Sequence, residues 1–261
     1  LSAILDEARR YVEQTEPTEF LLLKFDKCQN WSLIADACMA RLGPVLYTGG
    51  GNINTRTLQD LAGSVVVLFN RTGLQAMGGA RPGIMGFVNL NGVDTPGAQY
   101  DPQFDGLQYL GKGGTSAMNG KFDRGKMDDN IRKQTGIIRQ LSGSVHGSAP
   151  EVLGMIYWTS TGFLRSIRKR DDYMWRQRGG NRSRLTDLWT GGLEEAITAR
   201  LPQHLDPTQY AASGQLKVFM PNFVMVDFMD DVKGQFIKDL NDVAAVSLTL
   251  QALAQRAQQA N

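Results

Sequence analysis

Three charged residues stand directly after apolar runs that have the composition of buried strands. They are Lys24 after the run 20–23, Arg71 after 65–70 and Asp227 after 223–226. Charged groups at the carboxyl ends of parallel strands form the catalytic rim of parallel α/β barrels. Such a charge is paired or faces water, because burying it alone is costly. The pattern predicts a polar site at this rim, and a structural ion pair is the alternative for each residue.

The elements that must position these residues follow from the apolar spacing. Intervals of three and four residues predict helices, and short apolar runs rich in β-branched residues predict strands. We expect helices over 1–14, 32–42, 126–142 and 193–201, a helical turn over 58–63, and strands over 20–25, 65–70, 153–159 and 218–228. Strands separated by helices or long loops indicate a parallel sheet with crossover connections.

Two further segments have a distinct composition. The segment 71–125 is rich in Gly, Asn and Asp, which predicts long loops with a weak strand at 106–110. The segment 233–259 predicts one or two terminal helices. Its amphipathic stretch 243–258 is expected to pack on the sheet, with a role as an interaction helix as the alternative.

The expected strands resemble, in their order, those of the bacterial phosphatidylinositol-specific phospholipase C family. The segments that carry the resemblance are Glu19–Phe25, Leu61–Phe69, Tyr157–Thr159 and Val224–Phe228, preceded by the acidic, proline-containing turn that ends 11–18. The resemblance covers the C-terminal three quarters of that family's catalytic barrel. It implies an α/β fold of the (β/α)8 TIM type, regular or irregular, whose first two strands are absent from this chain.

The resemblance also implies a domain organisation. Residues 1–261 would form a single barrel domain that resembles the phospholipase C phosphodiesterases and ends in the helices of 233–259. A parallel barrel without two strands would expose open edges, which natural proteins avoid. We therefore expect an N-terminal segment upstream of Leu1 to complete the barrel, and a degenerate member that never had it is the alternative.

The activity that the resemblance implies is that of a phosphoric diester hydrolase. A hydroxyl beside the phosphate attacks it, a diacylglycerol leaves, and two histidines act as general base and general acid. Lys24 and Arg71 match residues that line the headgroup site, Tyr109 is assigned to the same substrate-binding set, and Asp227 matches the carboxylate that orients a catalytic imidazole. No cofactor or metal ligand is expected, although assistance by calcium stays open.

The chain departs from the family's pattern at the histidines. The family places them in a Thr-His-Asn or Thr-His-Asp context and at a later position, and neither context occurs here. His146 and His204 fall in turn-like loops, so no catalytic role is assigned to them. We expect the histidines to come from upstream of residue 1. The alternative is an inactive barrel that binds lipid or protein, as a component of an effector or toxin.

A basic segment suits contact with an anionic membrane. Over 165–184 it contains eight Arg and Lys residues interleaved with aromatic ones. Basic side chains are attracted to anionic headgroups and aromatic rings settle at their level. We assign Arg168, Arg170 and Trp175 to peripheral membrane docking. A solvated loop neutralised by Asp171, Asp172 and Asp187 is the alternative.

The overall composition excludes several classes of protein. The balance of 28 basic against 26 acidic residues does not favour a nucleic-acid partner. No apolar run approaches the ~18–20 residues of a membrane span, and Leu1–Arg10 lacks the apolar core of a signal peptide. Two cysteines are too few for a disulfide scaffold. We expect a soluble, secreted or exported protein, because soluble members of the family are often exported.

Overall fold

The structure is a computed structural model that describes residues 1–14, 18–92, 97–111, 124–144, 152–159, 168, 172–175, 177–178, 182–183 and 221–238. The chain divides into two compact units, Leu1–Tyr109 and Leu110–Asn261. Both contain parallel strands and helices, so the fold is α/β, as expected. A closed (β/α)8 barrel and a single domain over 1–261 stay predictions.

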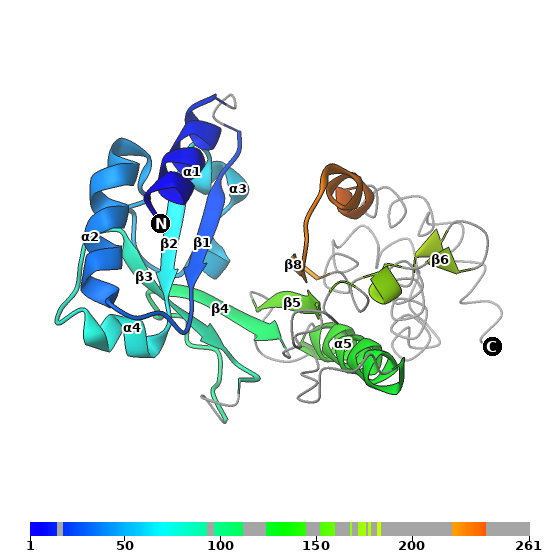
Figure 1. Cartoon of the computed structure of the whole chain (residues 1–261). Coiled ribbons are helices and arrows are strands. Elements are labelled where there is room, and N and C mark those ends of the chain that lie inside the picture. Colours follow the sequence, from blue (N-terminus) through cyan, green and yellow to red (C-terminus); the bar gives the residue numbers. More distant parts are fainter. Residues whose placement is uncertain are drawn as a thin grey trace. The chain divides into compact units, whose positions relative to one another are not determined.

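The described part of the first unit contains four helices and four strands (Figure 1). Its elements are α1 (Ser2–Gln14), β1 (Leu21–Phe25), α2 (Trp31–Leu42), α3 (Leu58–Leu61), β2 (Val65–Phe69), α4 (Arg71–Ala76), β3 (Ile84–Asn89) and β4 (Gly106–Gly111), with single 3-10 turns at Gly43–Val45 and Ile53–Thr55. The four strands pair in the order β1-β2-β3-β4, and all three pairings are parallel. The helices and strands expected in the first 70 residues are therefore confirmed.

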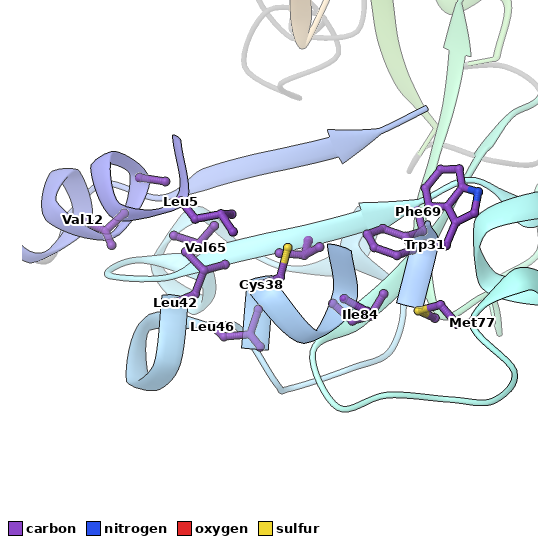
Figure 2. Close-up of a cluster of buried hydrophobic side chains, with 13 residues drawn as sticks. Leu5, Val12, Trp31, Cys38, Leu42, Leu46, Val65, Phe69, Met77 and Ile84 are labelled. Carbon is purple, nitrogen blue, oxygen red and sulfur yellow. The ribbon is translucent and has the colours of Figure 1, made fainter. Parts of the chain in front are cut away.

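One face of this sheet is covered by α1 and α2. Residues one helical turn apart, such as Leu5, Ala8 and Val12 of α1, are buried in the same cluster as Val65 and Phe69 of β2. In Figure 2 the labelled side chains of both helices converge on this side of β2. Burial of apolar surface at about 25 cal/mol per Å² is the main force that holds the two helices on the sheet.

The opposite face of the sheet carries the residues of functional interest. Lys24 is aligned with Leu68, and Leu68 with Met85. Side chains alternate along a strand, so Phe87 of β3 and Tyr109 of β4 share that face with Lys24. The register thus gathers residues 85 positions apart in sequence on one surface.

The expectation of long loops over 71–125 is wrong for part of that segment. Arg71–Ala76 is a helix, and Ile84–Asn89 is a strand in the interior of the sheet. The glycine in this strand, Gly86, is required by close packing, because a Cβ there would meet the ring of Phe104. A glycine that makes room for neighbouring atoms looks the same in sequence as one that makes a turn.

The second unit contains a pair of parallel strands and a long helix. Its elements are α5 (Arg124–Ser144), β5 (Leu153–Trp158), β8 (Phe223–Val226), the two-residue antiparallel strands β6 (Gln177–Arg178) and β7 (Arg182–Ser183), and a helix over 231–238. β5 and β8 pair in parallel from Met155 opposite Phe223 to Trp158 opposite Val226. Helix 126–142 and strand 153–159 are confirmed within a few residues.

Two buried amide side chains of α5 form hydrogen bonds with the backbone at the end of β5. The Asn130 Nδ2 donates to the carbonyl oxygen of Thr159 at 2.9 Å, and the Tyr157 N–H donates to Gln134 Oε1 at 2.8 Å. Gln134 Nε2 also donates to Asn130 Oδ1 at 3.1 Å. A helix packed by side-chain amides against backbone groups is fixed in register, because sliding would leave buried polar atoms without partners.

Burial of the Cys38 thiol makes the free energy of unfolding depend on pH in the alkaline range. The side chain lies fully inside the first unit, and desolvation raises its pKa from 9.0 to about 11. As pH rises, the Cys38 thiol loses its proton in the unfolded chain before it does so in the folded chain. The contribution of the buried thiol to stability is therefore intact below pH 9 and is lost as pH rises towards 11. We expect a loss of up to about 2–3 kcal/mol over this range.

Urea unfolding of the wild type and Cys38→Ala at pH 8, 9, 10 and 11 measures this contribution. The wild type should lose stability more steeply with pH than the variant, because every other titrating group is common to both. Parallel pH profiles for the two proteins would contradict the assignment.

Several sequence expectations fall wholly or partly outside the described residues. These are the helix over 193–201, most of the terminal helices of 233–259, residues 218–220 of the last expected strand, and both histidines, His146 and His204. In the part of the chain that the structure describes, no helix combines the length and apolar character needed to cross a membrane.

Candidate functional site

The candidate site lies around Lys24, at the carboxyl end of β1. Its side chain is about one fifth exposed, with a relative accessibility of 21%. The ammonium Nζ lies 4.3 Å from the ring centroid of Phe87 and 5.6 Å from that of Tyr109. Aromatic faces attract cations at these distances. The ammonium thus lies against aromatic rings of β3 and β4, while the side chain that carries it stays partly exposed.

A carboxylate accompanies this ammonium. Asp26 Oδ2 lies 4.0 Å from Lys24 Nζ. Asp26 is half exposed, and its other oxygen, Oδ1, accepts a hydrogen bond from Asn70 Nδ2 at 2.9 Å. Positive and negative groups therefore stand side by side, each partly open to solvent. Such a pair can bind a ligand that carries both oxygen acceptors and hydroxyl donors.

Asn70 links this pair to helix α4. Its Oδ1 accepts a hydrogen bond from the Gly73 N–H at 2.7 Å, which makes it the N-cap of the helix. Its Nδ2 holds Asp26. Arg71 follows as the first residue of the helix and is exposed. The cap therefore sets the position at which the Arg71 side chain leaves the backbone.

Replacing Asn70 separates its two roles. Asn70→Ala should lower the free energy of unfolding by about 1 kcal/mol, because the helix loses its cap. Asn70→Ser keeps a capping oxygen but lacks the amide that reaches Asp26, so it should retain most of the stability. Urea midpoints of the three proteins check this, and equal losses in both variants would show that the cap contributes little.

The electrostatics of Lys24 are dominated by its burial. Desolvation lowers the pKa of the Lys24 amine, the neighbouring Asp26 carboxylate raises it, and the charge of Lys27 lowers it further. The net direction is downwards. A larger fraction of this amine is unprotonated at a given pH than for a lysine in water.

Asp227 belongs to the second unit. It follows β8 directly, is partly buried, and precedes Phe228, whose φ is +51°. The Lys233 Nζ donates to the Phe228 carbonyl oxygen at 2.7 Å, and the Lys233 N–H donates to Asp230 Oδ1 at 2.8 Å. These bonds fix the turn between β8 and helix 231–238, so Asp227 leaves the strand end in a defined position.

The residues assigned to membrane docking differ in their surroundings. Arg168 is exposed, and Arg170 lies outside the described residues. Trp175 packs edge to face on Phe236 with ring centroids 5.8 Å apart, and Lys233 Nζ lies 5.7 Å from its ring. Trp175 thus has an internal packing role whatever it contacts outside the protein.

Among the described residues, no three His, Cys, Asp or Glu side chains gather in a way that could hold a metal ion. Asp26 stands beside an ammonium and an amide nitrogen, which are not metal ligands.

The structure brings together only part of the predicted site. Lys24 and Tyr109 meet on one face of the first unit, Arg71 follows the N-cap of α4, and Asp227 belongs to the other unit. Sequence reasoning missed Asp26, Asn70 and Phe87. Asp26 is two residues after Lys24, a spacing that places both on one face of an extended chain, and Asn70-Arg71-Thr72-Gly73 has the form of a capped helix start.

The fold and the site define a protein of the α/β class with a polar cluster at the carboxyl end of a parallel sheet. Comparisons with protein-family models, with curated proteins and with solved structures gave no match.

Proposed function

We propose that this chain forms the larger part of a phosphoric diester hydrolase that resembles phosphatidylinositol-specific phospholipase C. The observation that carries the proposal is the half-buried Lys24 ammonium beside Asp26 at the carboxyl end of a parallel sheet. A headgroup with phosphate oxygens and hydroxyls matches both charges: the ammonium donates to oxygens, and the carboxylate accepts from hydroxyls.

The reaction proposed is an intramolecular attack on phosphorus. A hydroxyl next to the phosphate attacks it, diacylglycerol leaves, and the phosphate closes into a ring on the headgroup. Lys24 and Asp26 orient the headgroup, Tyr109 forms a wall of the site, and Arg71 supplies a second cation for phosphate oxygens. Asp227 accepts the N–H of a histidine and so fixes its tautomer.

The histidines themselves are proposed to come from a segment upstream of residue 1. The topology supports a strand at the required place. In the described part of the chain β1 pairs with β2 alone, and α1 covers the same face of the sheet as α2. Crossovers between parallel strands are right-handed in nearly all proteins. A strand joined to β1 through α1 would therefore pair with the open edge of β1, which extends the sheet towards a (β/α)8 barrel.

The setting proposed for this activity is the surface of an anionic membrane, reached by a secreted or exported protein. The exposed Arg168 supports this, since a basic side chain there adds about 1 kcal/mol to membrane attraction.

The test is an assay of the complete polypeptide on vesicles of phosphatidylinositol and phosphatidylcholine. We expect release of diacylglycerol together with a cyclic phosphate of the headgroup. Binding to vesicles without either product would favour the second candidate, an inactive barrel that binds lipid. The ion pair of Lys24 and Asp26 supports this second candidate, because the pair can bind a headgroup without a histidine.

A further inference from the structure

The amine of Lys24 has surroundings that suit covalent chemistry as well as binding. Its Nζ lies against the rings of Phe87 and Tyr109, and a carboxylate oxygen of Asp26 is 4.0 Å away. The side chain retains an exposed fraction of 21%, so it is not sealed off from small molecules. An amine that is partly desolvated and stands beside a proton acceptor is the arrangement that makes lysine a nucleophile.

Two other lysines show what is particular to this one. Lys27 lies in the loop that follows β1 and is exposed. Lys233 is nearly buried, but its Nζ donates a 2.7 Å hydrogen bond to the Phe228 carbonyl oxygen and lies 3.7 Å from Asp230. That bond holds the ammonium of Lys233 in place. Lys24 is similarly buried, but within the described part of the chain its Nζ donates no hydrogen bond to a carbonyl oxygen.

We propose that Lys24 is an imine-forming amine whose ligand is a small, uncharged hydroxyaldehyde. The aldehyde needs no charge of its own, because the charges of Lys24 and Asp26 offset each other. A hydroxyl on the neighbouring carbon can donate to Asp26 Oδ2, which faces the amine, while Oδ1 is held by Asn70. This proposal is independent of the phosphodiesterase reaction and of any upstream histidine.

The step balances without an oxidant or reductant. The ammonium first gives its proton to Asp26, directly or through one water molecule. The nitrogen lone pair then attacks the carbonyl carbon, a C–N bond forms, and a proton passes from the now positive nitrogen to the former carbonyl oxygen to give a carbinolamine. The hydroxyl next leaves as water with a proton returned by Asp26, and the C=N bond of the protonated imine forms. The net change is amine plus aldehyde to imine plus water.

Reductive trapping tests this on the intact chain. The protein is incubated with glycolaldehyde and cyanoborohydride between pH 7 and 11, and modification of each lysine is followed by peptide mass spectrometry. Lys27 and Lys233 serve as internal controls in the same molecules, so no variant has to fold. We expect Lys24 to be modified at least about threefold faster than either control at pH 7.5. The excess over Lys27 should shrink towards pH 11, where amines in general become unprotonated.

The proposal is overturned if Lys24 is modified less than three times as fast as Lys27 or Lys233 at pH 7.5. So does an excess over Lys27 that persists unchanged at pH 11, since it would reflect access rather than the state of the amine. Lack of phosphodiesterase activity leaves the outcome unaffected, because trapping reads the lysine itself.

Discussion

Asp227→Asn in the complete polypeptide should lower the rate of phosphodiester cleavage by about 10⁴-fold, the scale of the same change in other His–Asp pairs. The Asn side chain is neutral, so it supports the imidazolium charge less well than a carboxylate does. Its NH2 group can also donate to the imidazole nitrogen, which would favour the wrong tautomer of the histidine. Folding should change little, because Asp227 is partly exposed at the end of β8. Initial rates on phosphatidylinositol vesicles and urea midpoints measure the two effects.

Asp231→Asn is the matched control for this prediction. It removes one carboxylate from the exposed start of helix 231–238, four residues further along the chain. Its rate should stay within about twofold of the wild type, because surface substitutions away from a site have small effects. Equal rates for both variants and the wild type would show that Asp227 orients no catalytic group.

Gly106→Ala should strongly destabilise the first unit. Gly106 has φ +141°, and a Cβ there would overlap the carbonyl oxygen of Gly86 on the neighbouring strand. The two residues are paired in the parallel register of β3 and β4. A clash with backbone cannot be relieved by a rotamer change, so we expect a loss of roughly 3 kcal/mol or more.

The control for this glycine is Gly97→Ala. Gly97 also has a positive φ, +75°, but a Cβ there would meet nothing within 4 Å. That substitution should cost about 1 kcal/mol, the backbone strain alone. Urea unfolding of both variants separates strain from overlap. A Gly106→Ala loss as small as that of Gly97→Ala would mean that β3 and β4 can move apart at no cost.

The sequence was informative wherever apolar periodicity was strong. The apolar spacing over 1–14 predicted α1 with one buried face, of which Leu5, Ala8 and Val12 are buried, whereas Leu1, Ile4 and Tyr11 are exposed. The β-branched run 65–70 predicted β2, whose residues are all buried. These patterns exist because each side chain must enter or avoid the core. Such a pattern indicates which residues of a segment are buried, and it can be recognised from that segment alone.

The strand β3 was missed because its glycine serves packing with a distant residue. Gly86 makes room for Phe104, and neither position alone shows that need. The partners of Lys24 were missed for the same reason: Phe87 and Tyr109 come within reach of its Nζ only through the register of four strands. A site assembled across strands depends on pairings that no single run of residues encodes.

The most direct measurement compares diacylglycerol release by the complete polypeptide with release by residues 1–261 alone, at equal concentration on phosphatidylinositol vesicles. Under the proposed function, the site residues Lys24, Asp26, Arg71 and Asp227 belong to this chain and both catalytic histidines to a segment upstream of it. The proposed function therefore predicts product from the complete polypeptide and none above background from residues 1–261. Equal rates from the two would contradict it, and so would a complete polypeptide that yields no product.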